Sequence, residues 1–406
     1  MSLPLSGIRV VDLTQYIAGP YATMLMADAG ATVIKVESPA GDDTRRIGPW
    51  VPAADGDVSA FHLRMNRGKQ SVVLDLKSDD GRAALASLIA GADVLVENYR
   101  AGVLERLGFG ADRLNRLNPG LVYCSISGFG HTPSPDRDRP AYNTVAEFES
   151  GIYSPPHPRV PGDLPGSIGL PVGDMVPALH ALAGLSMALL QRARTGAGSH
   201  VDISMFDSML SLNELRSSTA ISTDTDAVPD GRDYFCPYGV YPTRDGHLFL
   251  DVTTDRQWRG FCATIGRPDL ADDPGLATGP DRSARYDDVI GEPLETWLAA
   301  RGRDEACAAF LAHGVPVAVL RSPAEALLSA QSAARGMPLL VDDGHGAQVT
   351  VPASPIRVRP STAPHDPMPR PHTAARLGRD TREVLCAFTD LDPSTIDRLC
   401  SAQADL

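Results

Sequence analysis

The stretch Ile8-Arg9-Val10-Val11-Asp12-Leu13 decides the fold that the sequence predicts. Its β-branched and apolar residues indicate a buried strand. A helical stretch from Tyr21 to Ala29 follows and ends at Gly30, and residues 31–37 form a second β-branched run. Strand, helix and strand within about thirty residues make a βαβ unit. The sequence therefore predicts a parallel sheet with right-handed crossovers.

The same alternation continues along the chain. Strand-like runs recur at residues 72–76, 93–97 and 121–126, with a helical stretch at residues 79–90. This pattern is typical of a doubly wound α/β protein with a Rossmann-like parallel sheet. A chain of 406 residues exceeds the usual size of one hydrophobic core, so a second domain is expected.

The second half of the chain indicates a smaller domain. Residues 217–233 are rich in Ser, Thr and Asp, which is typical of a linker. Two strand-like runs flank Arg244-Asp245-Gly246 and predict a hairpin, and helical stretches follow at residues 257–265 and 293–313. We expect a large domain over 1–215, a linker over 216–234, a small α+β domain over 235–325, and a C-terminal segment over 326–406.

Composition excludes several classes of function. The chain is 43% hydrophobic and 21% charged, and its net charge of −13 disfavours nucleic acid and anionic membranes as partners. Its six cysteines are scattered without a C-x-x-C pair, which argues against zinc and suits a reduced cytoplasm. We see no secretory signal, and the apolar run 176–190 is too short to span a bilayer. We therefore expect a cytoplasmic protein without a metal site.

Glu37, at the end of the second predicted strand, suggests a dinucleotide-binding protein. An acidic residue at this place can bind a ribose. However, residues 14–20 lack the G-x-G-x-x-G fingerprint that lets a pyrophosphate approach the backbone. Hydride transfer is therefore disfavoured.

Basic residues gather near the predicted element ends, against the acidic balance of the whole chain. Ligands of open α/β sheets bind beyond the carboxyl ends of the strands, where Arg and Lys suit phosphate groups. Tyr99 is an aromatic residue that could stack on a base. Each residue alone is better explained as a solvated loop charge, but the set predicts an anionic, nucleotide-like ligand. The set comprises Arg45, Arg46, Arg64, Arg67, Lys69, Lys77, Arg100 and Arg106.

Gly173-Asp174 precedes an apolar run from Met175 to Leu190 that has helical spacing. Asp174 has two possible roles. It can be the N-cap of this helix, which spacing alone favours. Alternatively, it can be a carboxylate nucleophile that the glycine turn exposes and the helix N-terminus keeps ionised.

Six motifs in order resemble the class III CoA-transferases, the CaiB/BaiF family. They are Gly7–Leu13 with Ala18-Gly19-Pro20; Ala27–Glu37; Asn66–Lys69; Ala92–Arg100; Ser125–Gly130; and Gly173-Asp174 with Thr195–Gly198. The resemblance implies transfer of coenzyme A from an acyl-CoA to a free carboxylic acid, with no permanently bound cofactor. It also implies an interlocked homodimer, whose C-terminal segment returns to the large domain.

The resemblance also assigns site residues. The family's nucleophile falls on Asp174. The positions that contact CoA fall on Gln15, Tyr16, Ile17, Ser38, Leu74, Lys77, Asn98, Tyr99, Arg106 and Leu107. Formyl-CoA transferases have Lys where Pro140 stands, and Arg139 beside it is taken as a further contact. We assign Tyr142 a role in positioning the reacting groups. An ionised Asp needs no general base, which agrees with the lack of an obvious catalytic triad.

Two alternatives remain. The family includes 2-methylacyl-CoA racemases, whose catalytic His would stand where this chain has Tyr142, while His131 lies elsewhere, directly after Gly130. Proton transfer needs a base within reach, so transfer of CoA is favoured over racemisation. The third possibility is a CoA-binding protein without turnover.

Overall fold

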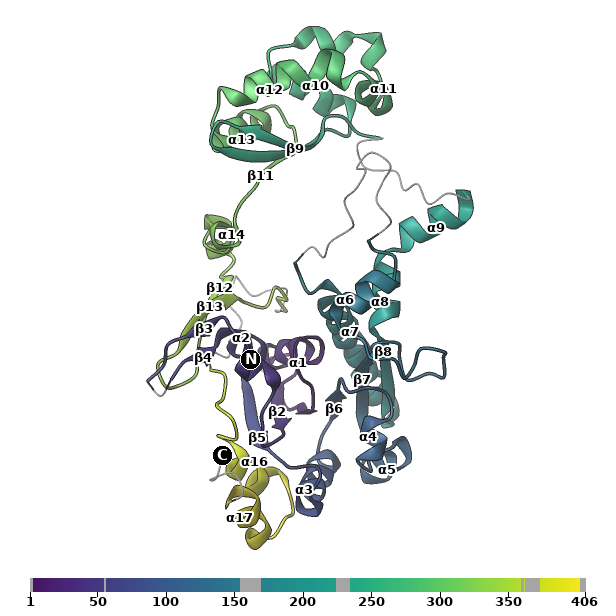
Figure 1. The fold of residues 1–406 in the computed structure, drawn as a ribbon, viewed down its shortest axis with the longest axis vertical. Helices are drawn as coiled ribbons and strands as arrows, with labels where there is room; N and C mark the ends of the chain where they lie inside the picture. The colour runs from purple at the N-terminus through teal and green to yellow at the C-terminus, as the bar shows by residue number, and fades with distance from the viewer. Residues whose placement is uncertain are drawn as a thin grey trace. The chain divides into compact units, whose positions relative to one another are not determined.

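The computed structural model describes residues 3–54, 56–153, 169–223, 234–358, 361 and 373–401. The chain divides into two compact units (Figure 1). The first contains residues 1–215 and 330–406, and the second contains residues 216–329. Helix α9 (Glu214–Thr223) occupies the start of the predicted linker, whose residues 224–233 lie outside the described part.

A six-stranded parallel sheet organises the first unit, as the sequence predicts. The strand order is β5-β2-β1-β6-β7-β8. The strands are β1 (Arg9–Asp12), β2 (Thr32–Glu37), β5 (Lys69–Val73), β6 (Val94–Glu97), β7 (Val122–Ser127) and β8 (Ser199–Ser204). Strand β5 begins and ends three residues before the predicted run, and β8 was not predicted. The order reverses between β1 and β6, so ligands are expected at the carboxyl ends of these two strands.

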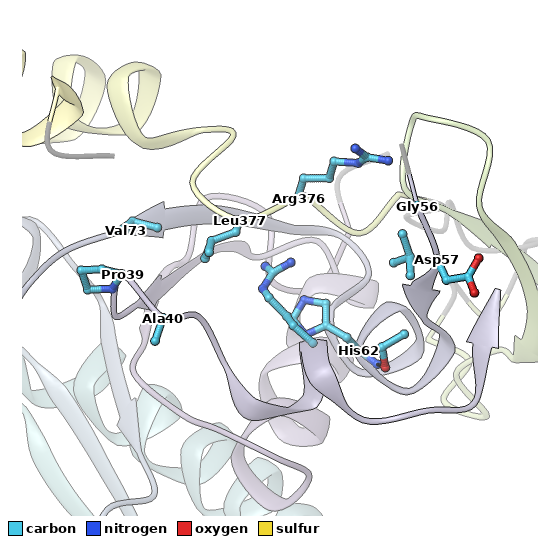
Figure 2. Close-up of a pocket in the computed structure, with 11 residues that line it drawn as sticks. Pro39, Ala40, Gly56, Asp57, His62, Val73, Arg376 and Leu377 are labelled. Carbon is cyan, nitrogen blue, oxygen red and sulfur yellow. Dashed lines mark hydrogen bonds between the residues drawn. The ribbon is translucent and has the colours of Figure 1, made fainter. Parts of the chain in front are cut away.

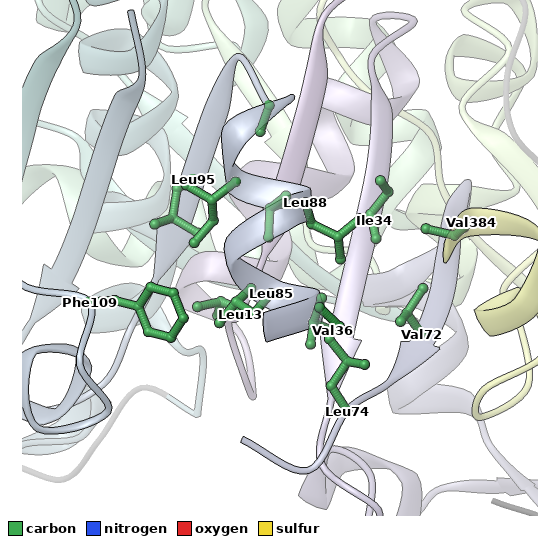
Figure 3. Packing of buried hydrophobic residues seen from close by; sticks show 14 of the residues in the cluster. Leu13, Ile34, Val36, Val72, Leu74, Leu85, Leu88, Leu95, Phe109 and Val384 are labelled. Atoms are coloured by element: carbon green, nitrogen blue, oxygen red, sulfur yellow. The ribbon is translucent and has the colours of Figure 1, made fainter. Parts of the chain in front are cut away.

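Two hydrophobic clusters cover the two faces of this sheet. Alternate residues of β1 and β2 enter different clusters, as the pleat requires: Val11 and Ile34 enter one, Val10 and Val33 the other. Helix α3 (Asp79–Ala90) covers the first face, where Figure 3 shows its leucines above the strands. Helices α1 (Ala18–Asp28), α7 (Val172–Thr195) and α8 (Met205–Leu212) cover the second. The α/β class of the large domain is therefore confirmed.

The C-terminal segment covers the edge strand β5. The N–H of Ser71 donates to the Asp380 carboxylate (2.8 Å), and the N–H of Asp380 donates to the Ser71 carbonyl (3.0 Å). The N–H of Val73 donates to the Thr381 hydroxyl (3.1 Å). Helices α16 (Thr381–Phe388) and α17 (Pro393–Ser401) then pack into the first hydrophobic cluster. The end of the chain is thus part of the large domain.

Shorter elements complete the first unit. They are the 3₁₀ turn η1 (Asp43–Arg46), β3 (Trp50–Val51), β4 (Val58–Ser59), α2 (Ala60–Asn66), α4 (Val103–Arg106), α5 (Ala111–Leu117), α6 (Asn143–Glu149), α15 (Ala330–Ala334), and the hairpin of β12 (Pro338–Asp342) and β13 (Gln348–Pro352).

The second unit is an α+β domain built on the predicted hairpin. Strands β9 (Tyr238–Thr243) and β10 (Gly246–Asp251) pair antiparallel, and β11 (Val317–Val319) joins β10. The predicted single helix over 293–313 is two helices, α12 (Gly291–Ala299) and α13 (Arg303–Ala312). The other elements are α10 (Asp255–Thr264), η3 (Pro268–Asp272), η4 (Pro274–Leu276), α11 (Gly279–Ala284), the π turn η5 (Tyr286–Ile290) and α14 (Pro323–Leu327).

Helix α7 is longer than the sequence predicts. It has 24 residues, whereas the predicted apolar run covers only 176–190, and by length and composition alone it is the one helix among those described that could cross a membrane. Buried residues such as Ala181 and Leu185 pack against the sheet. Three large apolar residues of α7 are exposed on the first unit: Leu179, Met187 and Leu190.

Candidate active site

A cavity of about 290 Å³ opens where the strand order reverses. The segments that follow β1 and β6 form one wall, and the segment before α6 and the start of α7 form another. The lining includes Gln15, Tyr16, Ile17, Phe61, Asn98, Tyr99, Arg100, Arg137, Arg139, Tyr142, Asn143, Asp174 and Met205. This is the place at which a doubly wound sheet binds its ligand.

Asn98 joins the two central strands at the cavity. The N–H of Gln15 donates to Asn98 Oδ1 (2.8 Å), and Asn98 Nδ2 donates to the Gln15 carbonyl (2.7 Å). The amide of Asn98 therefore holds the loop after β1. In the next loop, the N–H of Tyr99 donates to the buried Glu97 carboxylate (2.6 Å). Both walls of this part of the cavity are fixed by side chains at the end of β6.

Tyr16 has a backbone conformation that few residues other than glycine adopt. Its φ is +64°, which is strained for an aromatic residue. Its hydroxyl donates to Asp43 (2.8 Å), and this bond raises the pKa of Tyr16 to about 12. Its ring lies edge-to-face with that of Tyr142, with centroids 6.1 Å apart. The surroundings hold Tyr16 in place in spite of the strain.

A buried ionic network contacts the loop after β1. Lys69 Nζ donates to Asp12 (2.9 Å), and Lys35 Nζ lies 3.0 Å from Asp42 and donates to the Thr14 carbonyl (2.7 Å). All four side chains are buried. Burial by itself would raise the pKa of Asp12, but Lys69 and Lys35 lower it to about 2. Charges within this network are paired, as burial requires.

Asp174 lies in the first turn of α7 and faces the cavity. The N-cap of α7 is Pro171, so the interpretation of Asp174 as the cap is wrong. Instead, two side chains of α6 cover the first N–H groups of α7. The N–H of Gly173 donates to Glu147 (3.0 Å), and that of Asp174 donates to Asn143 Oδ1 (3.0 Å). The Asp174 carboxylate is thus left to the cavity.

Glycine at position 173 permits this close approach of α6 and α7. A Cβ added to Gly173 would lie 2.4 Å from the carbonyl oxygen of Asn143, which no side chain could avoid because that oxygen belongs to the backbone. The Gly-Asp pair is therefore explained by packing at Gly173 and by access at Asp174.

The pKa of Asp174 differs from the expectation of a carboxylate that the helix N-terminus keeps ionised. Burial, followed by the charge of Glu147, raises this pKa to about 7. Desolvation disfavours the charged form of any carboxyl group. Because Glu147 accepts the first-turn hydrogen bond, it also takes up part of the favourable field of the helix N-terminus.

The structure brings eight predicted site residues to this cavity: Gln15, Tyr16, Ile17, Asn98, Tyr99, Arg139, Tyr142 and Asp174. Tyr142 is 64% exposed. Five others lie outside its lining. Ser38 and Lys77 are exposed after β2 and β5, Leu74 is buried in the core, Arg106 is exposed on α4, and Leu107 packs against the core.

Two further hollows lie near the ends of β2 and β5. One, of about 560 Å³, is lined by Pro39, Ala40, His62, Arg376 and Leu377 among others (Figure 2). The other, of about 360 Å³, is lined by residues that include Asp75 and Ser78. Ser38 and Lys77 are therefore sequence neighbours of these hollows. The carboxyl edge of the sheet has room for an elongated ligand.

Several residues of the predicted basic set are already paired. Arg67 binds Asp28 (2.7 Å), Lys69 binds Asp12, and Arg45 binds Glu37 (2.7 Å). These pairs correct the interpretation of the whole set as an anion site. They also remove Glu37 as a ribose ligand, because its carboxylate is buried against Arg45. The arginines that line the cavity are Arg100, Arg137 and Arg139.

His131 is not placed as a racemase base would be. Its backbone N–H donates to Asp202 (2.9 Å), and its Nε2 lies 3.7 Å from Glu97. It is absent from the residues that line the Asp174 cavity. Within the described ranges, no group of three or more His, Cys, Asp or Glu side chains could hold a metal ion.

Among the cavity-lining positions that the sequence analysis missed are Phe61, Arg137, Asn143 and Met205. Asn143 directly follows Tyr142, so the sequence could have pointed to this segment. Its hydrogen bond with the N–H of Asp174 joins two helices and could not be predicted from local sequence. Phe61 and Met205 come from other elements and carry no motif.

The fold and the site define a doubly wound α/β protein in which one carboxylate, that of Asp174, stands among the described residues that line the ligand cavity. Residues 5–377 match the family model described as CoA-transferase family III, so the chain belongs to that family. It is 36% identical to an acetyl-CoA:oxalate CoA-transferase from Acetobacter aceti, over 89% of this chain and 91% of the relative. It is 35% identical to a succinyl-CoA:mesaconate CoA-transferase from Haloarcula hispanica, over 94% and 95%.

The structure is also similar to a solved one. A CaiB/BaiF family protein from Brucella suis superposes with a TM-score of 0.83 at 30% identity, over 96% of this chain and 100% of that chain. The protein is therefore a CoA-transferase that moves CoA between an acyl-CoA thioester and a carboxylic acid.

Proposed function

We propose that Asp174 is the nucleophile of the transfer reaction. The observation that carries this proposal is its place: its carboxylate faces the cavity at the switch point of the sheet, while α6 side chains cover the N–H groups around it. A carboxylate in this position can act without a general base.

The proposed reaction has four balanced steps. Asp174 attacks the thioester carbonyl, forms a mixed anhydride and expels CoA thiolate. The thiolate attacks the aspartyl carbonyl, which releases the donor acid and leaves an aspartyl-CoA thioester. The acceptor carboxylate attacks this thioester and expels the thiolate again. The thiolate then attacks the acyl carbonyl of the acceptor, which gives the new acyl-CoA and restores Asp174.

We further propose how CoA lies on the large domain. Gln15, Tyr16, Ile17, Asn98, Tyr99, Arg139 and Tyr142 surround the thioester end, with Tyr142 positioning the reacting groups. Ser38, Lys77, Arg106 and Leu107 serve the distant end of CoA along the carboxyl edge, and Leu74, whose side chain is buried in the core, lies beneath it. The hollows near β2 and β5 support this path. The proposal includes no permanently bound cofactor.

The acceptor is proposed to be a short dicarboxylic acid. Relatives are named for oxalate, glutarate and mesaconate. Of the three arginines that line the cavity, Arg100 suits a second carboxylate, whereas Arg137 already pairs with Asp138 and Arg139 with Asp136 and Glu149. A panel of mono- and dicarboxylic acceptors tests this, and equal kcat/KM for matched pairs of both kinds would contradict it.

Asp174→Asn tests the mechanism. We expect loss of at least about a thousandfold in kcat, because an amide neither attacks nor carries CoA. The matched control is Asp207→Asn, which changes the same position in the first turn of α8 and is not among the residues that line the cavity. After incubation with acyl-CoA and hydroxylamine, the peptide that carries Asp174 is expected to be modified, which mass spectrometry can detect. Retained turnover in Asp174→Asn would exclude the mechanism.

We also propose a homodimer in the cytoplasm. The exposed residues Leu179, Met187 and Leu190 of α7 support an interface with a second copy. The six cysteines are free thiols, which suits a reducing compartment. Met187→Glu is expected to yield monomers in light scattering, whereas Gln191→Glu on the same helix is not. A monomeric unmodified protein would contradict the dimer.

A further inference from the structure

Glu147 is a fully buried acidic residue beside the proposed nucleophile. It is 0% exposed and lies on α6, one turn after Asn143. One carboxylate oxygen accepts from the N–H of Gly173 (3.0 Å), and the other accepts from the hydroxyl of Tyr153 (2.8 Å). Both oxygens are thus held in place, and one of them contacts the main chain of Gly173, the residue directly before Asp174.

Asn143 and Glu147 form one face of α6, because residues four apart lie on the same side of a helix. Together they cover two consecutive N–H groups at the start of α7. The helix N-terminus favours an acidic partner, but a neutral side chain could accept the same hydrogen bond without the desolvation cost of a fully buried carboxylate. Its charge therefore calls for an explanation beyond helix capping.

We propose that Glu147 is a positioning residue for CoA transfer, which fixes the first turn of α7 and places a negative charge behind Asp174 to strengthen it as a nucleophile. This inference rests on the proposed role of Asp174. A carboxylate with a weaker conjugate acid gives more electron density to the carbonyl that it attacks, provided that it is ionised at the working pH.

The charge relationship supports this role. Two causes raise the pKa of Asp174: burial is the larger one, and the charge of Glu147 is the second. The other charged or titratable groups that line the cavity are Tyr16, Tyr99, Tyr142, Arg100, Arg137 and Arg139. Glu147 itself faces Tyr153 and the N–H of Gly173. Its carboxylate is therefore the acidic group that can act on Asp174 through the α6–α7 contact.

Glu147→Gln tests the proposal, because glutamine keeps the shape and an acceptor for the N–H of Gly173 but removes the charge. We expect the acid limb of kcat/KM to move down by about one pH unit and the plateau kcat to fall about tenfold. Glu147→Asp, which restores the charge, is expected to recover the position of the limb in part. Glu383→Gln on the surface of α16 is the control and should leave both unchanged.

The outcomes separate the two proposals. An unshifted acid limb in a folded Glu147→Gln enzyme, with Asp174→Asn still inactive, would overturn the role of Glu147 alone. Turnover by Asp174→Asn would overturn the nucleophile. Burial also raises the pKa of Glu97 to about 7, but Glu97 contacts Tyr99 and Tyr123. A limb that moves with Glu97→Gln and not with Glu147→Gln would assign it to Glu97 and contradict the proposal.

Discussion

Asn98 and Gln15 hold each other by two hydrogen bonds across the ends of β6 and β1, at 2.8 Å and 2.7 Å. The side-chain amide of Asn98 supplies one acceptor and one donor, and the main chain of Gln15 supplies the matching N–H and carbonyl groups. The loop that carries Tyr16 and Ile17 therefore depends on one amide group. If CoA binds in this cavity as proposed, Asn98 is expected to act on it chiefly through this loop.

Asn98→Ala is expected to raise KM for acyl-CoA about tenfold and to lower stability by about 1 to 2 kcal/mol, because two main-chain groups lose their partners. Steady-state kinetics and urea unfolding measure these effects. Asn118→Ala is the matched control, since Asn118 also binds main-chain groups, at Ile89, Ala92 and Gly120. It should lose similar stability with an unchanged KM. An equal rise of KM in both variants would contradict a specific role of the hydrogen bonds between Asn98 and Gln15.

Asp174→Asn is expected to stabilise the protein above pH 7. The folded-state pKa of Asp174 is about 7, above its usual value of 3.8, so folding favours the protonated form. The wild type therefore loses stability as the pH rises from about 4 to about 7. The variant does not, and it should gain about 1 to 2 kcal/mol at pH 8, after allowance for the partial exposure of the side chain. Thermal unfolding at pH 4 and pH 8 checks this, and a gain that is equal at both would contradict it.

Asp12→Asn is expected to destabilise the fold by about 3 kcal/mol, since it leaves Lys69 and Lys35 in the interior with less compensation. The pKa of Asp12 is lowered to about 2, so its contribution is present above pH 4 and is lost as the pH falls toward 2. Urea unfolding at pH 7 and pH 3 measures it. Asp79→Asn, in an exposed pair with Arg82, is the control and should change stability by less than about 0.5 kcal/mol. Equal effects would disprove the importance of burial.

Gly173→Ala is expected to reduce kcat by more than about tenfold, because the added methyl group forces α6 and α7 apart and displaces Asp174. Kinetics together with circular dichroism distinguish this from unfolding. In Gly110→Ala the new Cβ meets only ordinary contacts, 3.6 Å from Glu105, and activity should persist. Normal turnover by Gly173→Ala would show that the close packing is not required.

The sequence predicted the parts of the fold that depend on local pattern. The β-branched runs gave β1, β2, β6 and β7, and the Asp-Gly turn gave the hairpin of β9 and β10. Strand β8 was not predicted because Ser199–Ser204 alternates polar and apolar residues. It lies at the edge of the sheet and lacks the continuous apolar run of the central strands.

The site was predicted in part, for a related reason. Asp174 lies in a contiguous motif, so its position was readable. The pairing of Lys69 with Asp12 and of Arg67 with Asp28 joins residues 57 and 39 positions apart, and no local pattern shows it. The basic set was therefore overestimated as an anion site. Glu147 was missed because its importance comes from contact with another helix.

The bonds from Asp380 and Thr381 to β5 have a consequence for biosynthesis. A ribosome makes Ser71 more than 300 residues before the partners that complete its strand edge, as their separation of 309 positions shows. Until the end of the chain has emerged, the nascent large domain presents an uncovered strand edge, which other chains can pair with. Final closure of the domain must therefore follow the completion of synthesis, and truncated chains should be prone to aggregation.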